Sequence, residues 1–299
     1  MRFGIMAMQT GMLIPPHKSP AELMAHFSTL TNAEVVRQLH ANGFNLIELG
    51  GDLSLFLPNS FSPAAIEELG LLKEEKGISY TVHLPLWSVE TSTPLQPVRQ
   101  GSVQAVIDIL KDTLPLQPEC YVLHATGALA AEFTQMRISP PAKAFLLRMF
   151  QSGAAESLKT ILGETGIPSR QLAIETIEFP FELTQELAEK FDLSFCLDTG
   201  HVLAGFSGPL GLFDALEACL PRLGNIHLHD APWQGEARVL GYGKDHQALG
   251  KGDLDLPRFL DRLERAAYAG PIIFELTLPE ALESLEAVRA VRPDLITRP

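Results

Sequence analysis

The chain has 299 residues, of which 46% are hydrophobic and 20% charged. This composition argues against a mostly disordered protein and supplies ample material for a buried core. Asp and Glu total 36 against 23 Lys and Arg, giving a formal net charge of −13, which argues against general nucleic-acid binding through an electropositive surface.

The three cysteines, Cys120, Cys196 and Cys219, are odd in number and lack a short paired spacing. They predict neither a disulfide framework nor a cysteine zinc site, and they suit a reducing compartment. The N-terminal segment lacks the apolar stretch and cleavage site of a secretory signal, and no later apolar run is long enough for a membrane span. We therefore expect a cytoplasmic protein without a membrane segment, whose oligomeric state the sequence does not indicate.

Short apolar runs rich in Ile, Val, Leu and Phe alternate with segments of helical periodicity. The predicted strands are residues 2–8, 44–50, 79–86, 119–125, 171–177, 193–200, 225–231 and 271–277. The predicted helices are residues 31–42, 61–75, 97–114, 142–164, 182–190, 209–221, 255–268 and 279–290.

Continuously apolar strands indicate burial on both faces, and alternation with helices indicates parallel pairing through crossovers. Eight strand–helix units predict an α/β fold, a closed (β/α)8 TIM barrel in which residues 1–299 form a single domain. The alternative is an open doubly wound sheet, which more often has a glycine-rich phosphate turn after its first strand. Residues 7–11, Ala-Met-Gln-Thr-Gly, are not such a turn.

Histidines and acids occur at or just beyond the carboxyl ends of the predicted strands, where a barrel places its active site. These residues are His83, His124, Glu175, Asp198, His201, His227, His229, His246 and Glu275. Any one of them alone is more often structural, but carboxylates that converge on one mouth repel each other unless cations are bound. Imidazoles combined with carboxylates favour zinc, with manganese second, and Glu175 or Glu275 could bridge two ions about 3.5 to 4 Å apart.

A glycine-rich segment, residues 241–252, follows the seventh predicted strand. Its glycines permit tight turns, so His246 could fold over the site. A plain surface loop remains an equal alternative.

Three motifs occur in order along the chain: Leu-Asp-Thr-Gly-His at 197–201, His-Leu-His-Asp at 227–230, and His-Gln-Ala-Leu-Gly-Lys-Gly at 246–252. In these motifs the chain resembles the xylose-isomerase-like TIM-barrel superfamily, also called AP endonuclease family 2. The resemblance extends from about the second strand to the eighth.

The endonuclease IV branch of that superfamily binds three zinc ions. The resemblance implies that the metal ligands here are His83, His124, Glu175, Asp198, His201, His227, His246 and Glu275. One ligand departs from the pattern, because Lys244 stands where an aspartate is expected and Asp245 is displaced by one position. We therefore expect two bound ions and a third set of metal ligands that lacks one member. Lys244 is expected to contact the phosphate of the substrate instead.

The sugar isomerase and epimerase branch resembles the chain in Glu175, Asp198, His227 and Glu275, which would hold one metal while the two glutamates move a proton. That branch tends to carry an acid and an arginine where this chain has Phe181 and Trp233. A one-metal epimerase also has no need for the histidines that end the third and fourth strands.

Cobamide-remodelling phosphodiesterases of the same superfamily resemble the chain at Tyr-Thr-Val-His-Leu-Pro-Leu (80–86), at Tyr-Val-Leu-His (121–124), at 175–182 and at 243–246. The chain departs from that subgroup at Trp87, where an aspartate is expected. Trp87 and Trp233 could offer apolar walls to a large substrate, or could simply be packing residues.

The leading hypothesis is a metal-dependent phosphodiesterase that cleaves a small molecule, which a cobamide would exemplify, with metal-activated water. Glu175, Glu275 and Lys244 are its candidate catalytic residues. A sugar isomerase or epimerase is the main alternative, repair of abasic DNA is disfavoured by the acidic charge, and a non-enzymatic binding protein would use the histidines structurally.

Overall fold

The computed structural model describes residues 1–6, 19–57, 59–233 and 245–295, and the strands in these ranges close into a parallel barrel in chain order. The strands are β1 (Arg2–Met6), β2 (Leu46–Gly50), β3 (Ser79–His83), β4 (Tyr121–Leu123), β5 (Leu172–Glu175), β6 (Ser194–Asp198), β7 (Leu223–His227) and β8 (Pro271–Phe274). Pairing of β1 with β8 closes the ring. The predicted barrel is confirmed.

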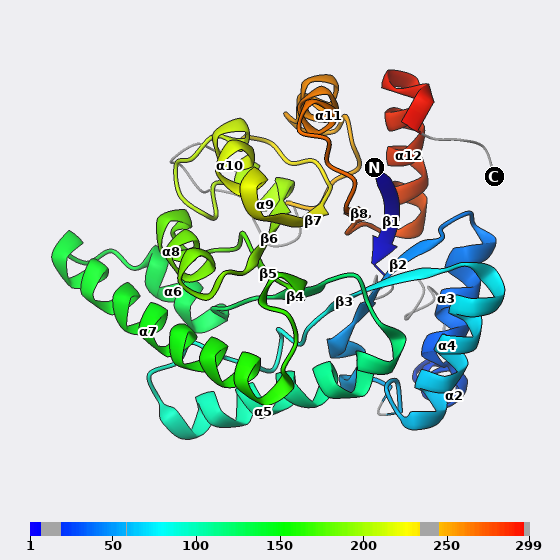
Figure 1. Ribbon diagram of the computed structural model, residues 1–299, viewed down its shortest axis with the longest axis horizontal. Coiled ribbons are helices and arrows are strands. Elements are labelled where there is room, and N and C mark those ends of the chain that lie inside the picture. The colour runs from blue at the N-terminus through cyan, green and yellow to red at the C-terminus, as the bar shows by residue number, and fades with distance from the viewer. Residues whose placement is uncertain (7–18, 58, 234–244, 296–299) are drawn as a thin grey trace.

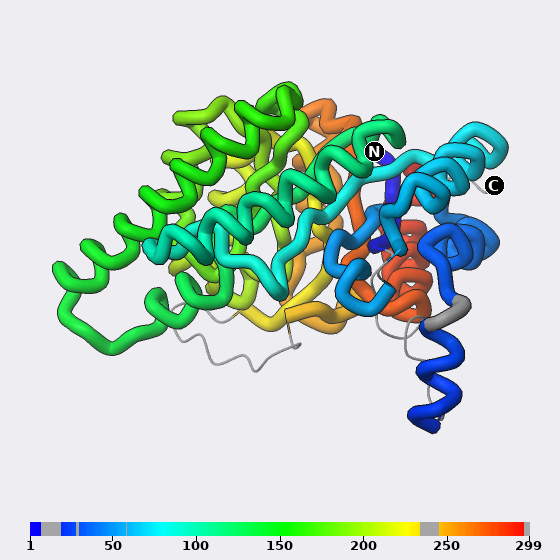
Figure 2. The backbone as a smooth tube through the Cα atoms, turned by 90° about the horizontal axis from the view of Figure 1, so that it is seen from below, coloured from blue at the N-terminus to red at the C-terminus, as the bar shows by residue number. Residues whose placement is uncertain are grey.

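Helices surround the barrel, as Figure 1 shows. They are α2 (Pro20–Thr29), α3 (Asn32–Ala41), α4 (Pro63–Lys76), α5 (Gln96–Thr113), α6 (Ala128–Gln135), α7 (Pro140–Thr165), α8 (Phe181–Phe191), α9 (Thr199–Leu203), α10 (Leu212–Cys219), α11 (Leu256–Arg265) and α12 (Leu278–Val291). Each predicted helical segment coincides with one of them, whereas α2, α6 and α9 were not predicted. Helix α2 projects from the body of the barrel (Figure 2).

Side chains along each strand alternate between the helices and the barrel interior. In β3 the hydroxyl of Tyr80 donates to the carbonyl of Leu69 in α4, at 3.0 Å. Thr81 faces the other way and donates to the Glu48 carboxylate of β2, at 2.8 Å. His83, two residues further, shares that inward direction, so the strand period delivers it into the mouth.

Strand β2 ends at Gly50 as predicted, whereas strands β3 to β8 end two to four residues earlier than predicted. Strand β6 stops at Asp198, and α9 begins at the next residue, because the Asp198 carboxylate caps that helix by accepting a hydrogen bond from the His201 amide at 2.6 Å. Strand β3 likewise ends at His83 rather than at residue 86. The last residues of β3, β5, β6 and β7 are therefore all candidate ligands, His83, Glu175, Asp198 and His227, while His124 and Glu275 directly follow β4 and β8.

Among the described residues, no helix combines the length and the apolar character needed to cross a membrane.

Candidate metal centre

The Glu175 carboxylate, at the end of β5, lies at the centre of the mouth. One of its oxygens, Oε2, lies 3.1 Å from Nε2 of His83 and 3.0 Å from Nε2 of His124. The other, Oε1, lies 3.3 Å from Nδ1 of His227. His83, His124 and Glu175 thus bring three ligand atoms within 4.8 Å of one another, which forms a first donor group.

A second donor group shares Glu175 with the first. It consists of Glu175, Asp198, His227 and Glu275. The Nδ1 atom of His227 lies 3.2 Å from Oε2 of Glu275 and 3.8 Å from Oδ2 of Asp198. Three carboxylates therefore surround one imidazole nitrogen, a ligand set suited to zinc or manganese.

A third donor group is formed by His201, Asp245 and His246. Oδ2 of Asp245 lies 2.9 Å from Nδ1 of His246 and 3.5 Å from Nε2 of His201. The displacement of this aspartate by one position was expected to leave the third set without a ligand. In the structure the Asp245 carboxylate nevertheless lies near both histidines, and the number of bound ions stays a prediction. Lys244, the predicted phosphate contact, lies outside the described residues.

His229, whose role the sequence left open, bridges the second and third groups. Its Nε2 lies 2.8 Å from Oδ2 of Asp198, and its Nδ1 lies 2.6 Å from the backbone oxygen of Asp245. Its ring stacks on that of His246, with centroids 4.1 Å apart. A Cβ on Gly200 would lie 2.2 Å from both the His229 ring and the Asp245 oxygen, so only glycine fits there.

The carboxylates and imidazoles of the site shift each other's pKa values toward their charged forms. Burial opposes ionisation of Glu175, but the imidazoles of His227 and His124 outweigh it and hold the pKa of this carboxyl well below its usual range. Burial also disfavours a charged histidine, yet the hydrogen bond to Glu175 raises the pKa of His83 to about 9. Asp198 likewise raises the pKa of His201 to about 9.

These shifts mean that the buried carboxylates require positive charge among them. Glu175 and Asp198 are at most 1% exposed, so solvent screens the repulsion between their carboxylates poorly. The raised pKa values of His83 and His201 favour protonated imidazoles as the source of that charge, and divalent cations would replace those protons on binding. The donor set therefore fits a metal centre.

Carboxylates that the sequence analysis did not single out hold this site in place. Glu48 of β2 is fully buried and lies 2.9 Å from Nε2 of His227. Asp230 accepts hydrogen bonds from the amides of Gly250 and Leu254, and so fixes the segment that follows His246. An acid inside an apolar run, as in Leu-Ile-Glu-Leu at 46–49, is the signal that could have revealed Glu48.

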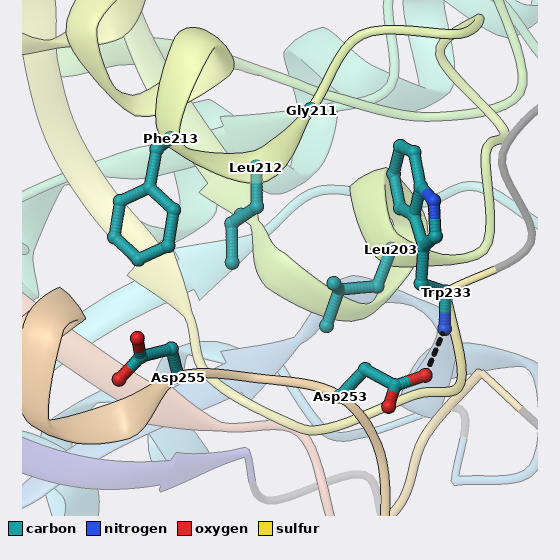
Figure 3. Close-up of a pocket in the computed structure, with 7 residues that line it drawn as sticks. All are labelled: Leu203, Gly211, Leu212, Phe213, Trp233, Asp253 and Asp255. Atoms are coloured by element: carbon teal, nitrogen blue, oxygen red, sulfur yellow. Dashed lines mark hydrogen bonds between the residues drawn. The ribbon is translucent and has the colours of Figure 1, made fainter.

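A small cavity of about 180 Å³ lies where the segments after β6 and β7 meet, beyond His201 and His227 in the chain. Leu203, Leu212, Phe213 and Trp233 give it apolar walls, and the Trp233 amide donates to Asp253 at 2.8 Å (Figure 3). The predicted wall residue Trp233 therefore lines a cavity to which α9, the helix that carries His201, contributes Leu203.

Trp87, the other predicted wall residue, lies elsewhere. It is 48% exposed and stands edge-on to Phe56, with ring centroids 6.1 Å apart. The Asp52 carboxylate accepts a hydrogen bond from its amide at 3.2 Å, which fixes this turn after β3. The structure therefore does not bring the two tryptophans together in one cavity.

Comparison with known proteins agrees with the barrel fold. Residues 36–292 match the family described as xylose isomerase-like TIM barrel. The chain belongs to this family. The uncharacterized protein MJ1311 of Methanocaldococcus jannaschii is 22% identical over 230 residues, which cover 76% of this chain and 75% of that protein.

Two solved structures share the family fold. A D-tagatose 3-epimerase-like protein superposes with a TM-score of 0.70 at 18% identity, covering 99% of this chain and 98% of its own. Endonuclease IV from Thermus thermophilus superposes with a TM-score of 0.66 at 22% identity, covering 98% of this chain and 100% of its own. The resemblance inferred from the motifs is thus confirmed for the family, while membership of the cobamide subgroup stays a prediction.

Proposed function

We propose that this family member is a metal-dependent hydrolase that cleaves a phosphodiester in a small-molecule substrate. The observation that carries the proposal is the sharing of Glu175 between two donor groups, one with His83 and His124 and one with Asp198, His227 and Glu275. A carboxylate with one oxygen toward each group is the arrangement that bridges two neighbouring metal ions. The proposed ions are zinc, or manganese as the second choice.

The residues of the chain would prepare this centre in several ways. The Nδ1 atom of His83 lies 2.9 Å from the Leu84 carbonyl, so it donates there and leaves Nε2 free for a metal. The Nδ1 atom of His201 faces the Thr176 carbonyl at 3.1 Å in the same way, leaving Nε2 toward Asp245. Bound divalent ions would supply an activated water and neutralise the charge that develops on the phosphate.

The net charge of the chain and the shape of its cavity limit the kind of substrate that it can bind. The net charge of −13 opposes a long polyanion such as DNA, but a single phosphate could still enter a cationic metal centre. The cavity lined by Trp233 and Leu212 offers an apolar surface to the remainder of a larger substrate. A cobamide, which joins a phosphodiester to bulky ring systems, is our specific candidate.

A metal-dependent sugar or sugar phosphate isomerase or epimerase is the second candidate. The four-donor group is complete by itself, and it contains Glu175 and Glu275, the two glutamates that such chemistry would use. Against it, both oxygens of Glu175 already contact imidazoles, which leaves that carboxylate poorly placed to move a proton.

Metal stoichiometry combined with substrate panels tests the proposal. Elemental analysis of the purified chain should find at least two ions per chain, and hydrolysis should be seen with bis(4-nitrophenyl) phosphate or a cobamide. The double variant His83→Ala, His124→Ala should lose one ion and at least about 100-fold in hydrolysis, while His40→Ala, a change in the outer helix α3, should lose neither. One ion per chain, together with ketose epimerisation that survives the double variant, would replace the hydrolase proposal with the epimerase.

A further inference from the structure

Glu48 is a carboxylate buried in the barrel interior, below the ring of candidate ligands. It comes from the middle of β2, it is 0% exposed, and nothing in the proposed reaction uses it. Its oxygen Oε1 lies 2.9 Å from Nε2 of His227. Its oxygen Oε2 accepts hydrogen bonds from the hydroxyl of Thr81 at 2.8 Å and from the side-chain amide of Asn225 at 3.0 Å.

This arrangement determines which nitrogen of His227 is available to a metal. A neutral imidazole carries one proton, and the nitrogen that donates a hydrogen bond cannot bind a cation. Nε2 faces the Glu48 carboxylate and keeps its proton there, so Nδ1, which faces Glu175 and Glu275, is the nitrogen that would give up its proton and bind a cation. The ring orientation is fixed at the same time, since the other Glu48 oxygen is held by Thr81 and Asn225.

The cost of this buried charge argues for a specific role. An uncompensated carboxylate inside a protein is strongly unfavourable, and an apolar side chain would fill the same space without needing three donors. Thr81 in β3 and Asn225 in β7 are both buried in the barrel interior. Two strands thus each place a polar residue beside Glu48.

The geometry points to Glu48 as the positioning residue of the metal centre: it holds His227 as the Nε2-protonated tautomer, so that Nδ1 binds the ion of the group formed with Glu175, Asp198 and Glu275. This inference rests on the metal centre of the proposed function, and it does not depend on which reaction that centre performs. Outer carboxylates of this kind contribute to metal affinity by orienting the ligand and raising its basicity.

The variant Glu48→Gln keeps the shape of the side chain and removes its charge. Zinc affinity, measured on the full chain by competition with a chromophoric chelator, should fall by about 10- to 100-fold for one site. The site that contains His83 and His124 should lose less, because the hydrogen bonds of Glu48 go to His227, Thr81 and Asn225. The control Thr81→Val removes a hydrogen bond to the other oxygen of Glu48, so it should weaken zinc binding less than Glu48→Gln does.

A second measurement separates positioning from mere folding. Long-range proton–nitrogen spectra of the zinc-loaded wild-type chain should show His227 protonated at Nε2 and bound through Nδ1. Metal binding at wild-type affinity in a folded Glu48→Gln variant would overturn the inference, as would protonation of His227 at Nδ1 or a wild-type chain that binds no zinc. If Glu48→Gln does not fold, Thr81→Val and the wild-type spectra decide.

Failure of the proposed hydrolase activity and failure of the proposed role of Glu48 give different experimental outcomes. A wild-type chain that binds zinc and hydrolyses no phosphodiester defeats the hydrolase, while the zinc affinities of the two variants still decide the role of Glu48.

Discussion

The two ends of the barrel both gather charged side chains, but they hold them differently. At the amino end, Arg2 pairs with Glu119, and Asp192 lies between Arg170 and Arg222. These side chains are open to solvent, with Arg2 46% and Asp192 62% exposed. At the carboxyl end, Glu175, Asp198 and His227 are almost completely buried, and even the outer donors, such as His246 at 28%, are less exposed than Arg2 or Asp192.

This difference in solvent exposure distinguishes charged residues that only support the fold from those that form a functional site. An exposed ion pair adds little to the stability of the folded state, because each charged group is solvated by water almost as favourably as it is neutralised by the opposite charge. Buried carboxylates that face one another lose that solvation, so they persist only where cations or protons neutralise them. Clustered charge therefore indicates a site only at the carboxyl end.

The largest expected effect is that of Glu175→Gln. Since both carboxylate oxygens serve donor groups, the amide cannot bridge two cations, and we expect loss of bound metal together with at least about a 1,000-fold fall in turnover. Elemental analysis and hydrolysis rates check this. Glu119→Gln, the same substitution at the amino end, should change neither quantity; full metal content and activity in Glu175→Gln would refute the bridging role.

The sequence predicted the barrel and most of its candidate ligands, because periodicity and strand-end position follow from local chemistry. It missed what depends on three-dimensional contacts. Glu48 lies in the middle of an apolar strand, and its contact with His227 joins residues distant in the chain. Asp245 was discounted on spacing along the chain, although the fold brings it to both His201 and His246. The short helix α9 depends on its Asp198 cap rather than on a long periodic pattern.

Gly200→Ala tests how tightly the carboxyl end is packed. The added methyl group would overlap the His229 ring and the Asp245 backbone, so we expect a loss of about 2–3 kcal/mol in unfolding free energy and displacement of the third donor group. Chemical denaturation and metal content measure the two effects. Gly163→Ala in α7 meets no atom within 4 Å and should be neutral or stabilising. Equal stabilities for the two variants would contradict the close packing.

Asp230→Asn probes a carboxylate that acts only through the loop it holds. The Gly250 and Leu254 amides donate to different oxygens of Asp230, and asparagine keeps only one of them, so one amide loses its acceptor, which should cost about 1–2 kcal/mol in unfolding free energy. The segment carrying Asp245 and His246 should loosen, so the metal of the third group should be lost first. Asp255→Ala, which removes the cap of α11, should cost about 1 kcal/mol without affecting metal content. Unchanged metal affinity in Asp230→Asn would show that the loop is held by other contacts.

Arg2→Met should have the smallest effect, although it breaks a bidentate pair. The guanidinium donates to both oxygens of Glu119, with one contact at 2.7 Å, but the Arg2 side chain is 46% exposed to solvent. Methionine retains the apolar stem, so the unfolding free energy should fall by less than about 1 kcal/mol, and metal content should not change. Denaturation at low and high salt is the decisive measurement, because an exposed pair is screened and the difference from wild type should shrink as salt is added. If Arg2→Met lowered the unfolding free energy as much as Gly200→Ala does, the ion pair at the amino end would matter as much for stability as the packing around the metal centre.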